Sequence, residues 1–234
     1  MKILRLAARF SKRFHLSHAW PMAFFMTGYM VWFSLIEMIP RRFYLQVILQ
    51  ADRSIPFVEQ FVIPYYSWFF YVGYGLVLIY LTDRYEFDRL CTTLMMGMTL
   101  FLLVSTFLPT RQPLRLASLP RDNIFTRLIG RLWLTDTPTN VWPSIHVYNT
   151  SAIEIAFFKA DTPRTKRRSF RVITMIWAVL IILSTMFIKQ HSLIDVLSAL
   201  SFIAISYAIV YMSGRVLRFR RWDAFAEAFE EKYG

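Results

Sequence analysis

Long apolar runs constrain this chain more than any other feature. A bilayer core about 30 Å thick requires about 20 apolar residues in one helix, and shorter spans are tolerated inside a bundle. Six stretches of the sequence fit this requirement: 21–39, 65–81, 90–108, 144–158, 172–188 and 192–212. With 56% apolar residues and 22 Phe, the chain is also more apolar than an ordinary soluble domain. We therefore predict an all-α, polytopic membrane protein built as a bundle of six transmembrane helices.

The fourth stretch differs from the others because it is short and contains Asn149 and Glu154. Polar side chains in a membrane-crossing helix are costly where they face lipid. We therefore expect this stretch to face the interior of the bundle.

Basic residues are distributed unevenly around the six stretches. Most of the 27 Lys and Arg residues fall on one side of a six-span arrangement, in both terminal segments, at Arg84 and Arg89, and in the connection 159–171. Cytoplasmic flanks of membrane proteins are enriched in Lys and Arg. This side is therefore predicted to be cytoplasmic, and both termini with it.

The expected organisation has three parts: a cytoplasmic interfacial arm (1–19), a membrane domain (20–213) with a long outer loop (109–143), and a cytoplasmic amphipathic tail (214–234). The arm carries apolar residues at helical spacing between basic ones, which is typical of a helix lying in the membrane interface. An organelle transit sequence is the alternative, because the arm has no acidic residue.

The net charge of +12 follows from these basic flanks, which suit the anionic surface of a membrane. No nucleic-acid-binding module accompanies the basic residues, so we expect membrane lipids and not nucleic acid as partners. The single Cys91 excludes an internal disulfide framework, and the sequence shows no cluster of metal ligands. No metal or other cofactor is expected, and the oligomeric state is left open.

Two histidines stand at the outer ends of predicted spans. His146 lies in Pro143-Ser144-Ile145-His146, and His191 precedes Asp195 by four residues. An ionisable group close to hydrocarbon is usually retained for a partner or for chemistry. A carboxylate one helical turn away can fix the tautomer of an imidazole and support its cationic form.

The outer loop contains five arginines on the side where positive charge is disfavoured: Arg111, Arg115, Arg121, Arg127 and Arg131. A guanidinium group matches the oxygens of a phosphate, so the loop is interpreted as an anion-binding mouth. The alternative is a solvated loop with a short helix that carries Arg127 and Arg131. Ser144 is placed to cap the next helix, whose amino terminus would favour an anion beside His146.

The motifs resemble the type 2 phosphatidic acid phosphatase (PAP2) superfamily. Its pattern is a Lys and an Arg-Pro, then Pro-Ser-Gly-His, then Ser-Arg followed after five residues by His and, four residues on, Asp. Here the second motif is Pro143-Ser144-Ile145-His146, and the third is Ser184-Thr185 followed by His191 and Asp195. The resemblance covers the order of the motifs, their sidedness and most of the chain from about residue 90.

Three positions depart from the family pattern. Ile145 replaces the glycine, Thr185 replaces the arginine of the third motif, and Arg115-Leu116 is the nearest counterpart of Arg-Pro, without the preceding lysine. Lys189, one helical turn beyond Thr185, is a candidate to restore the missing charge. Inositol phosphorylceramide synthases and sphingomyelin synthases, in the same wider superfamily, also vary these motifs.

The resemblance implies a reaction and a set of roles. His191, oriented by Asp195, would attack phosphorus, and His146 would protonate the leaving oxygen and then activate the acceptor. The candidate phosphate ligands are Arg115, Ser144, Lys189 and Ser184.

The implied function is a lipid phosphatase of the cell membrane. It would hydrolyse a lipid phosphate or pyrophosphate near the outer face through a phosphohistidine. The alternative is a phospholipid headgroup transferase of the inositol-phosphoryl or phosphocholine type. A transporter or a non-catalytic membrane protein is a lesser alternative.

Overall fold

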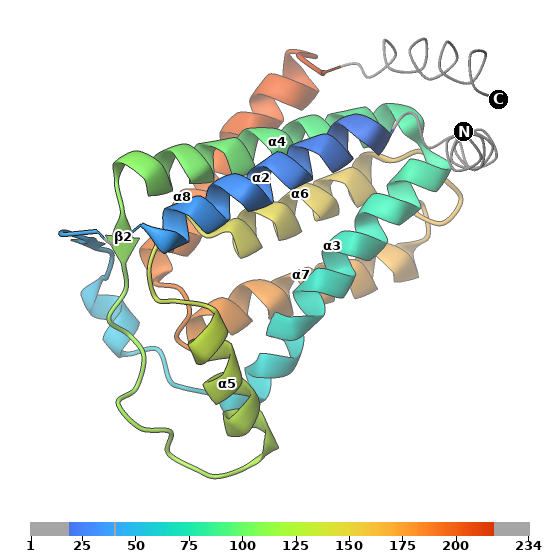
Figure 1. Cartoon of the computed structure of the whole chain (residues 1–234). Helices are drawn as coiled ribbons and strands as arrows, with labels where there is room; N and C mark the ends of the chain where they lie inside the picture. Colours follow the sequence, from blue (N-terminus) through green and yellow to red (C-terminus); the bar gives the residue numbers. More distant parts are fainter. Residues whose placement is uncertain (1–18, 40, 218–234) are drawn as a thin grey trace, which may run out of the picture.

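The computed structural model describes residues 19–39 and 41–217, which form a helical bundle (Figure 1). Seven α-helices lie in these residues: α2 (Trp20–Met38), α3 (Val62–Thr82), α4 (Arg84–Phe107), α5 (Ile124–Thr135), α6 (Ile145–Lys159), α7 (Arg168–Phe187) and α8 (Leu193–Tyr207). The shorter elements are β1 (Leu45–Gln46), β2 (Thr110–Arg111), two 3-10 turns (Gln50–Arg53 and Glu59–Phe61) and a π-helical turn (Ala208–Met212). The predicted helical class is confirmed, apart from the small parallel pairing of β1 with β2.

Four helical segments of the described residues are long and apolar enough to cross a membrane: Glu59–Thr82, Arg84–Phe107, Arg168–Phe187 and Leu193–Met212. They correspond to four of the six predicted spans. α2 has 19 residues, contains Pro21 and Glu37, and is not among these four. α6 has only 15 residues, fewer than the roughly 20 that a bilayer core requires. The six-span arrangement therefore remains a prediction.

α6 lies at the centre of the bundle and packs against α3, α4, α7 and α8. Asn149 and Glu154 are both buried there, so this helix faces the interior as its polar residues predicted. The phenol of Tyr148 donates to the Thr93 carbonyl (2.9 Å) and lies 2.7 Å from the Ser206 hydroxyl oxygen. These bonds connect α6 with α4 and α8.

Small residues allow the close approach of α6. A Cβ at Gly97 on α4 would overlap the ring of Tyr148, and one at Gly75 on α3 would lie 2.5 Å from a side-chain carbon of Ile153. Glycine at these two positions therefore sets the helix spacing around α6.

Several helices begin earlier than the apolar runs indicated. α4 starts at Arg84 and not near residue 90, because the Asp83 carboxylate accepts a hydrogen bond from the Glu86 amide (3.0 Å) and caps the helix. α7 likewise starts at Arg168, so its first turn carries charge. Apolar runs in the sequence identify the lipid-soluble part of a helix but not its polar first turn.

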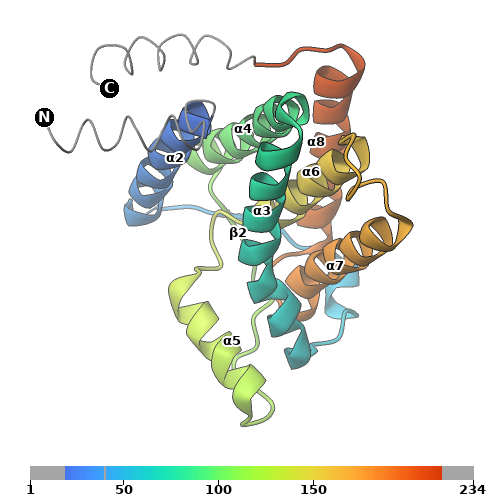
Figure 2. The ribbon, with the colours of Figure 1, turned by 90° about the vertical axis from the view of Figure 1, so that its right-hand side faces the viewer.

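The connections that carry the predicted site gather at one end of the bundle. There α5, β1 and β2 and the α7–α8 turn lie together, while the α3–α4 and α6–α7 connections lie at the other end (Figures 1 and 2). The interfacial arm is predicted over 1–19 and the amphipathic tail over 214–234. Apart from residue 19 and residues 214–217, both lie outside the described residues.

Candidate functional site

The His191–Asp195 contact forms at the amino terminus of α8. Ser192 caps this helix, and the Asp195 carboxylate folds back to accept a hydrogen bond from the Ser192 amide (2.8 Å). The same carboxylate oxygen lies 3.3 Å from His191 Nδ1. His191 itself precedes the helix, so a capping interaction, and not a shared helix face, brings imidazole and carboxylate together. This arrangement leaves His191 Nε2 for another contact.

That second contact is with His146, in the first turn of α6. His191 Nε2 and His146 Nδ1 are 3.4 Å apart. Ser144 caps α6 by accepting from the Val147 amide (3.4 Å), and its own amide donates to the Asp195 carbonyl (3.4 Å). The last bond ties the two motifs to each other directly. The two rings are therefore adjacent, with no phosphate-sized gap between their nitrogens.

Aromatic residues of α3 flank the His146 ring. Its centroid lies 4.7 Å from that of Tyr65 and 4.4 Å from that of Trp68. These contacts hold the His146 ring in place. The histidine pair is thus fixed by residues from three helices.

Both histidines line a cavity of about 550 Å³. Its polar part is formed by the histidines with Asp136, Thr137, Thr139, Asn140, Asn149 and Gln190. Its apolar part lies between α2, α3 and α4, and includes Met22, Met26, Met30, Phe33, Val72, Leu76, Leu94, Met98 and Phe101. Among the described residues that line this cavity, none is Lys or Arg. The cavity can hold a molecule with one polar end and a long apolar part.

Arg115 lies behind the polar end of the cavity. Its guanidinium group donates to the Gln190 side-chain oxygen (2.7 Å) and to the carbonyls of Trp133 (3.0 Å) and Asp136. Burial lowers the pKa of Arg115, opposed by the charge of Asp136. Arg115 is thus hydrogen-bonded to Gln190, the residue directly before His191 in the chain. Arg115 itself does not line the cavity.

Asp136 and Gln190 are components of the site that the sequence did not indicate. One carboxylate oxygen of Asp136 accepts from the Tyr65 hydroxyl (3.0 Å) and from the Gln190 amide (2.7 Å). Burial raises the pKa of the Asp136 carboxyl, although the Tyr65 hydrogen bond acts in the opposite direction. In the sequence Asp136 is only part of a turn before Pro138, and no spacing connects it with His191. For Gln190, its position directly before His191 was the one feature of the sequence that pointed to the site.

Lys189 and Ser184 do not reach the cavity. Lys189 has a positive φ of 59°, and its ammonium group donates to the carbonyls of Asp52 (3.1 Å) and Ile55 (2.5 Å). Burial lowers the pKa of Lys189. The Ser184 hydroxyl donates to the Ile181 carbonyl within α7 (2.6 Å). Neither side chain is part of the cavity lining, because each is bound to backbone carbonyls elsewhere, and their role as phosphate ligands stays a prediction.

The other loop arginines also lie outside the polar end of the cavity. Arg121 pairs with Glu59 (2.7 Å), and Arg127 pairs with Asp122 (2.8 Å) on the exposed side of α5. Of the five arginines in the loop, Arg115 is the one that is hydrogen-bonded to the neighbour of His191.

Comparisons with known proteins found no match for the chain among protein-family models, curated proteins or solved structures. Within residues 19–39 and 41–217, no group of three or more His, Cys, Asp or Glu side chains is arranged to hold a metal ion. The functional assignment therefore rests on the geometry of the histidine pair and its cavity.

Proposed function

We propose that this chain is a membrane enzyme of the PAP2 type that hydrolyses a lipid phosphate or pyrophosphate through a phosphohistidine on His191. The observation that carries the proposal is the chain of contacts from Asp195 through His191 to His146 at the polar end of a cavity whose remainder is apolar. A nucleophile, a group that orients it and an acid or base within hydrogen-bonding distance are the parts that covalent catalysis requires.

The first step is attack on phosphorus. Asp195 at Nδ1 favours the tautomer in which Nε2 carries the lone pair, and it stabilises the positive charge that develops on the ring. The new P–N bond forms as the P–O bond to the lipid breaks, and His146 gives its proton to the departing oxygen. Since Nε2 and His146 Nδ1 are 3.4 Å apart, the rings must separate to admit the phosphoryl group from the cavity.

The second step returns the enzyme to its starting state. His146 accepts a proton from water, the water oxygen attacks phosphorus, and the P–N bond breaks to release phosphate and restore His191. The free amides of Ile145 and His146 in the first turn of α6 are suited to hold the nonbridging oxygens. Arg115 supplies positive charge through Gln190. These roles need no metal or other cofactor.

The apolar part of the cavity suits the hydrocarbon part of a lipid. It is lined by methionine and aromatic side chains of α2, α3 and α4, and flexible methionines adapt to apolar chains of varied shape. The polar end coincides with the histidine pair, so a bound lipid would present its phosphate to Nε2.

The proposal also includes a membrane topology and the membrane face at which the active site opens. The basic residues predict a cytoplasmic position for the connection 159–171, and the end of the bundle with α5 and the α7–α8 turn lies opposite it (Figure 1). A six-span topology, with α2 and α6 as the additional spans, leaves both termini cytoplasmic. The active site would then open near the outer face of the cell membrane.

A product assay tests the reaction. The purified protein is incubated with a panel of lipid phosphates and pyrophosphates, and free phosphate is measured with wild type and His191→Gln. The proposal expects release of phosphate by wild type and no release above background by the variant. Equal release by both proteins would exclude His191 as the nucleophile.

Headgroup transfer is the second candidate, and the composition of the polar end favours it. Asp136 lines the cavity, no described lining residue is Lys or Arg, and the side-chain oxygens of Asn140 and Asn149 are buried without a partner. Such a site accepts hydrogen bonds and offers little compensation for the double negative charge of a phosphomonoester. A phosphodiester, with one negative charge and a headgroup bearing hydroxyls, fits this composition better.

The same assay separates the two candidates when new lipid products are followed beside free phosphate. A transferase yields a new phospholipid when an alcohol acceptor is present, whereas a hydrolase yields free phosphate with or without it. Asn140→Leu and Asn149→Leu are expected to lower transfer more than hydrolysis. An acceptor-independent product ratio in wild type would exclude transfer.

A further inference from the structure

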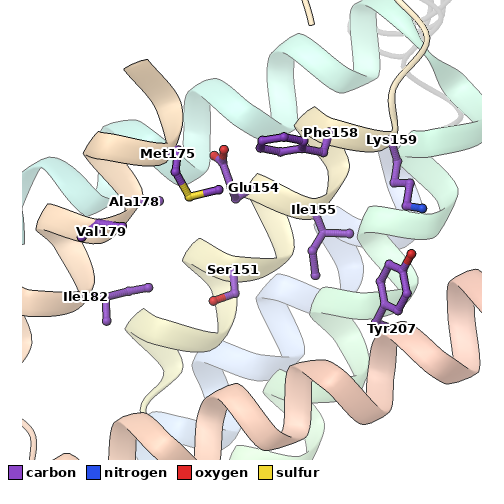
Figure 3. A pocket seen from close by; sticks show the side chains of 10 residues that line it. All are labelled: Ser151, Glu154, Ile155, Phe158, Lys159, Met175, Ala178, Val179, Ile182 and Tyr207. Carbon is purple, nitrogen blue, oxygen red and sulfur yellow. The ribbon is translucent and has the colours of Figure 1, made fainter. Parts of the chain in front are cut away.

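A second cavity, of about 380 Å³, opens between α6, α7 and α8 (Figure 3). It shares no lining residue with the histidine cavity. Along α6 it extends from Ser151 to Lys159, which is about 12 Å at 1.5 Å per residue. We call it the α6–α8 groove. Along the groove, part of the surface of α6 is not covered by α7 or α8.

The α6–α8 groove is apolar and open at the surface. Met175 and Val179 on α7 are 42% and 44% exposed, respectively. Glu154 lines the groove, and its two side-chain oxygens accept hydrogen bonds from the Tyr71 hydroxyl (2.6 Å) and the Thr174 hydroxyl (3.1 Å). Both carboxylate oxygens therefore already have a donor. An elongated apolar surface on a membrane helix bundle suits a hydrocarbon chain.

Positive charge gathers at one end of the groove. The Lys159 ammonium lies 5.1 Å from the centroid of the Tyr207 ring, and no carboxylate of the described residues pairs with it. A neighbouring cavity of about 410 Å³ shares Phe158 and Met175 with the groove and is lined by Lys166, which pairs with Asp161, and by Arg168 and Arg171. Asp161 is the one acidic residue in the connection 159–171. The cations thus stand where an apolar groove meets the predicted cytoplasmic headgroup layer.

We propose that the α6–α8 groove binds an acyl chain of an anionic phospholipid, whose phosphate lies beside Lys159 and Arg168. Anionic lipid headgroups are attracted to basic groups near the cytoplasmic surface by about 1 kcal/mol for each Lys or Arg, which is about fivefold in affinity. The groove supplies the site for the chain and the cations supply the preference for negative charge. The proposal is independent of the histidine chemistry, because the groove is separate from that cavity.

Lipid retention by the full-length protein tests this site. The protein is purified in detergent, stripped of lipid and offered phosphatidylglycerol and phosphatidylcholine in equal amounts, and native mass spectrometry counts the lipids bound. Wild type is expected to retain phosphatidylglycerol in preference to phosphatidylcholine. Lys159→Gln should weaken that retention about fivefold. Val179→Trp should abolish it by filling the groove.

Two matched variants serve as controls. Arg84→Gln removes one exposed positive charge at the same end of the bundle, and Ile173→Trp adds the same bulk to an exposed position of α7 outside the groove. Both should retain phosphatidylglycerol as wild type does. Equal losses in Lys159→Gln and Arg84→Gln would mean general surface attraction and would overturn the site. Unchanged retention in Val179→Trp would do the same, as would a wild-type dimer that dissociates in Val179→Trp and shows no lipid preference.

Discussion

At the scale of residues, His191 has two neighbours with different effects on its ring. Asp195 is bound to the Ser192 amide and lies beside Nδ1, so its position does not depend on the histidine. His146 lies beside Nε2 and is held between that nitrogen and the aromatic rings of Tyr65 and Trp68. His191 Nδ1 therefore has Asp195 as a fixed charged partner. His191 Nε2 has His146, which a phosphoryl group would displace in the proposed reaction.

Asp136→Asn tests the buried carboxyl group beside this pair. Burial raises the pKa of Asp136, so its contribution to the free energy of unfolding is fully present below the unfolded pKa of about 3.9 and is lost as the pH rises through the folded value. Both hydrogen bonds fall on one oxygen, which an asparagine retains. Melting temperatures in detergent should therefore show the variant gaining on wild type as the pH rises from 4 to 8. A difference that is constant with pH would contradict the raised pKa.

Arg115→Ala tests whether the charge behind Gln190 acts on the phosphate. We expect activity to fall about 100-fold, as for other groups that stabilise a developing negative charge. Arg127→Ala is the control, because Arg127 pairs with Asp122 at the surface. Both proteins should remain folded by size-exclusion chromatography. Similar small losses in the two variants would show that Arg115 is only structural.

The sequence predicted residues that are close along the chain better than residues brought together by the loop. His191 and Asp195 do meet, although through a helix cap and not along a helix face. Lys189 has a positive φ, and its ammonium group donates to the carbonyls of Asp52 and Ile55, which no local pattern indicates. The position of Asp136 depends on the path of the outer loop back to α3, where Asp136 contacts Tyr65, 71 positions earlier in the chain.

At the scale of elements, α6 carries His146 and is the helix that most of the bundle contacts. Its 15 residues and its buried polar side chains are consistent with a helix largely enclosed by protein, apart from the side that lines the α6–α8 groove. The apolar runs predicted the other helices well, because lipid-facing surfaces require continuous apolar sequence. They did not predict α5; a short helix there was part of the alternative interpretation of the outer loop, in which it carries Arg127 and Arg131.

Gly97→Ala tests the packing of α6. The added Cβ would overlap the Tyr148 ring, which is held by the Thr93 carbonyl and the Ser206 hydroxyl. We expect a loss of about 1–3 kcal/mol in stability, seen as a lower melting temperature. Gly73→Ala is the control, since nothing lies within 4 Å of a Cβ there. A Gly97→Ala protein as stable as Gly73→Ala would show that α4 and α6 are further apart.

At the scale of the whole molecule, the two cavities are lined by different residues of α6 and by different neighbouring helices. The lining of the histidine cavity includes residues 135–137 and 139–141 of the outer loop and Gln190, whereas the α6–α8 groove extends along α6 to Lys159, the last residue of that helix (Figure 3). Charge distribution along the sequence predicts which end is cytoplasmic. The number of spans does not follow from this charge distribution, because α6 is short and neither α2 nor α6 is among the four candidate spans.

Cysteine labelling in intact cells tests the orientation. In a Cys91→Ala background, Leu134→Cys on α5 and Pro163→Cys in the α6–α7 connection each introduce one exposed thiol. A membrane-impermeant maleimide should label position 134 in intact cells and position 163 only after lysis. Labelling of both positions in intact cells, or of position 163 alone, would contradict the predicted topology.

The most direct measurement of the central claim is the trapping of a phosphoenzyme. Wild-type protein is quenched during turnover of a lipid phosphate labelled at phosphorus, and the labelled residue is mapped. The account predicts an acid-labile phosphohistidine at His191, its absence in His191→Ala, and a slower but detectable label in His146→Ala with a substrate that has a good leaving group. Label on the His191→Ala protein at the wild-type level would contradict the account, because the nucleophile would then be another residue.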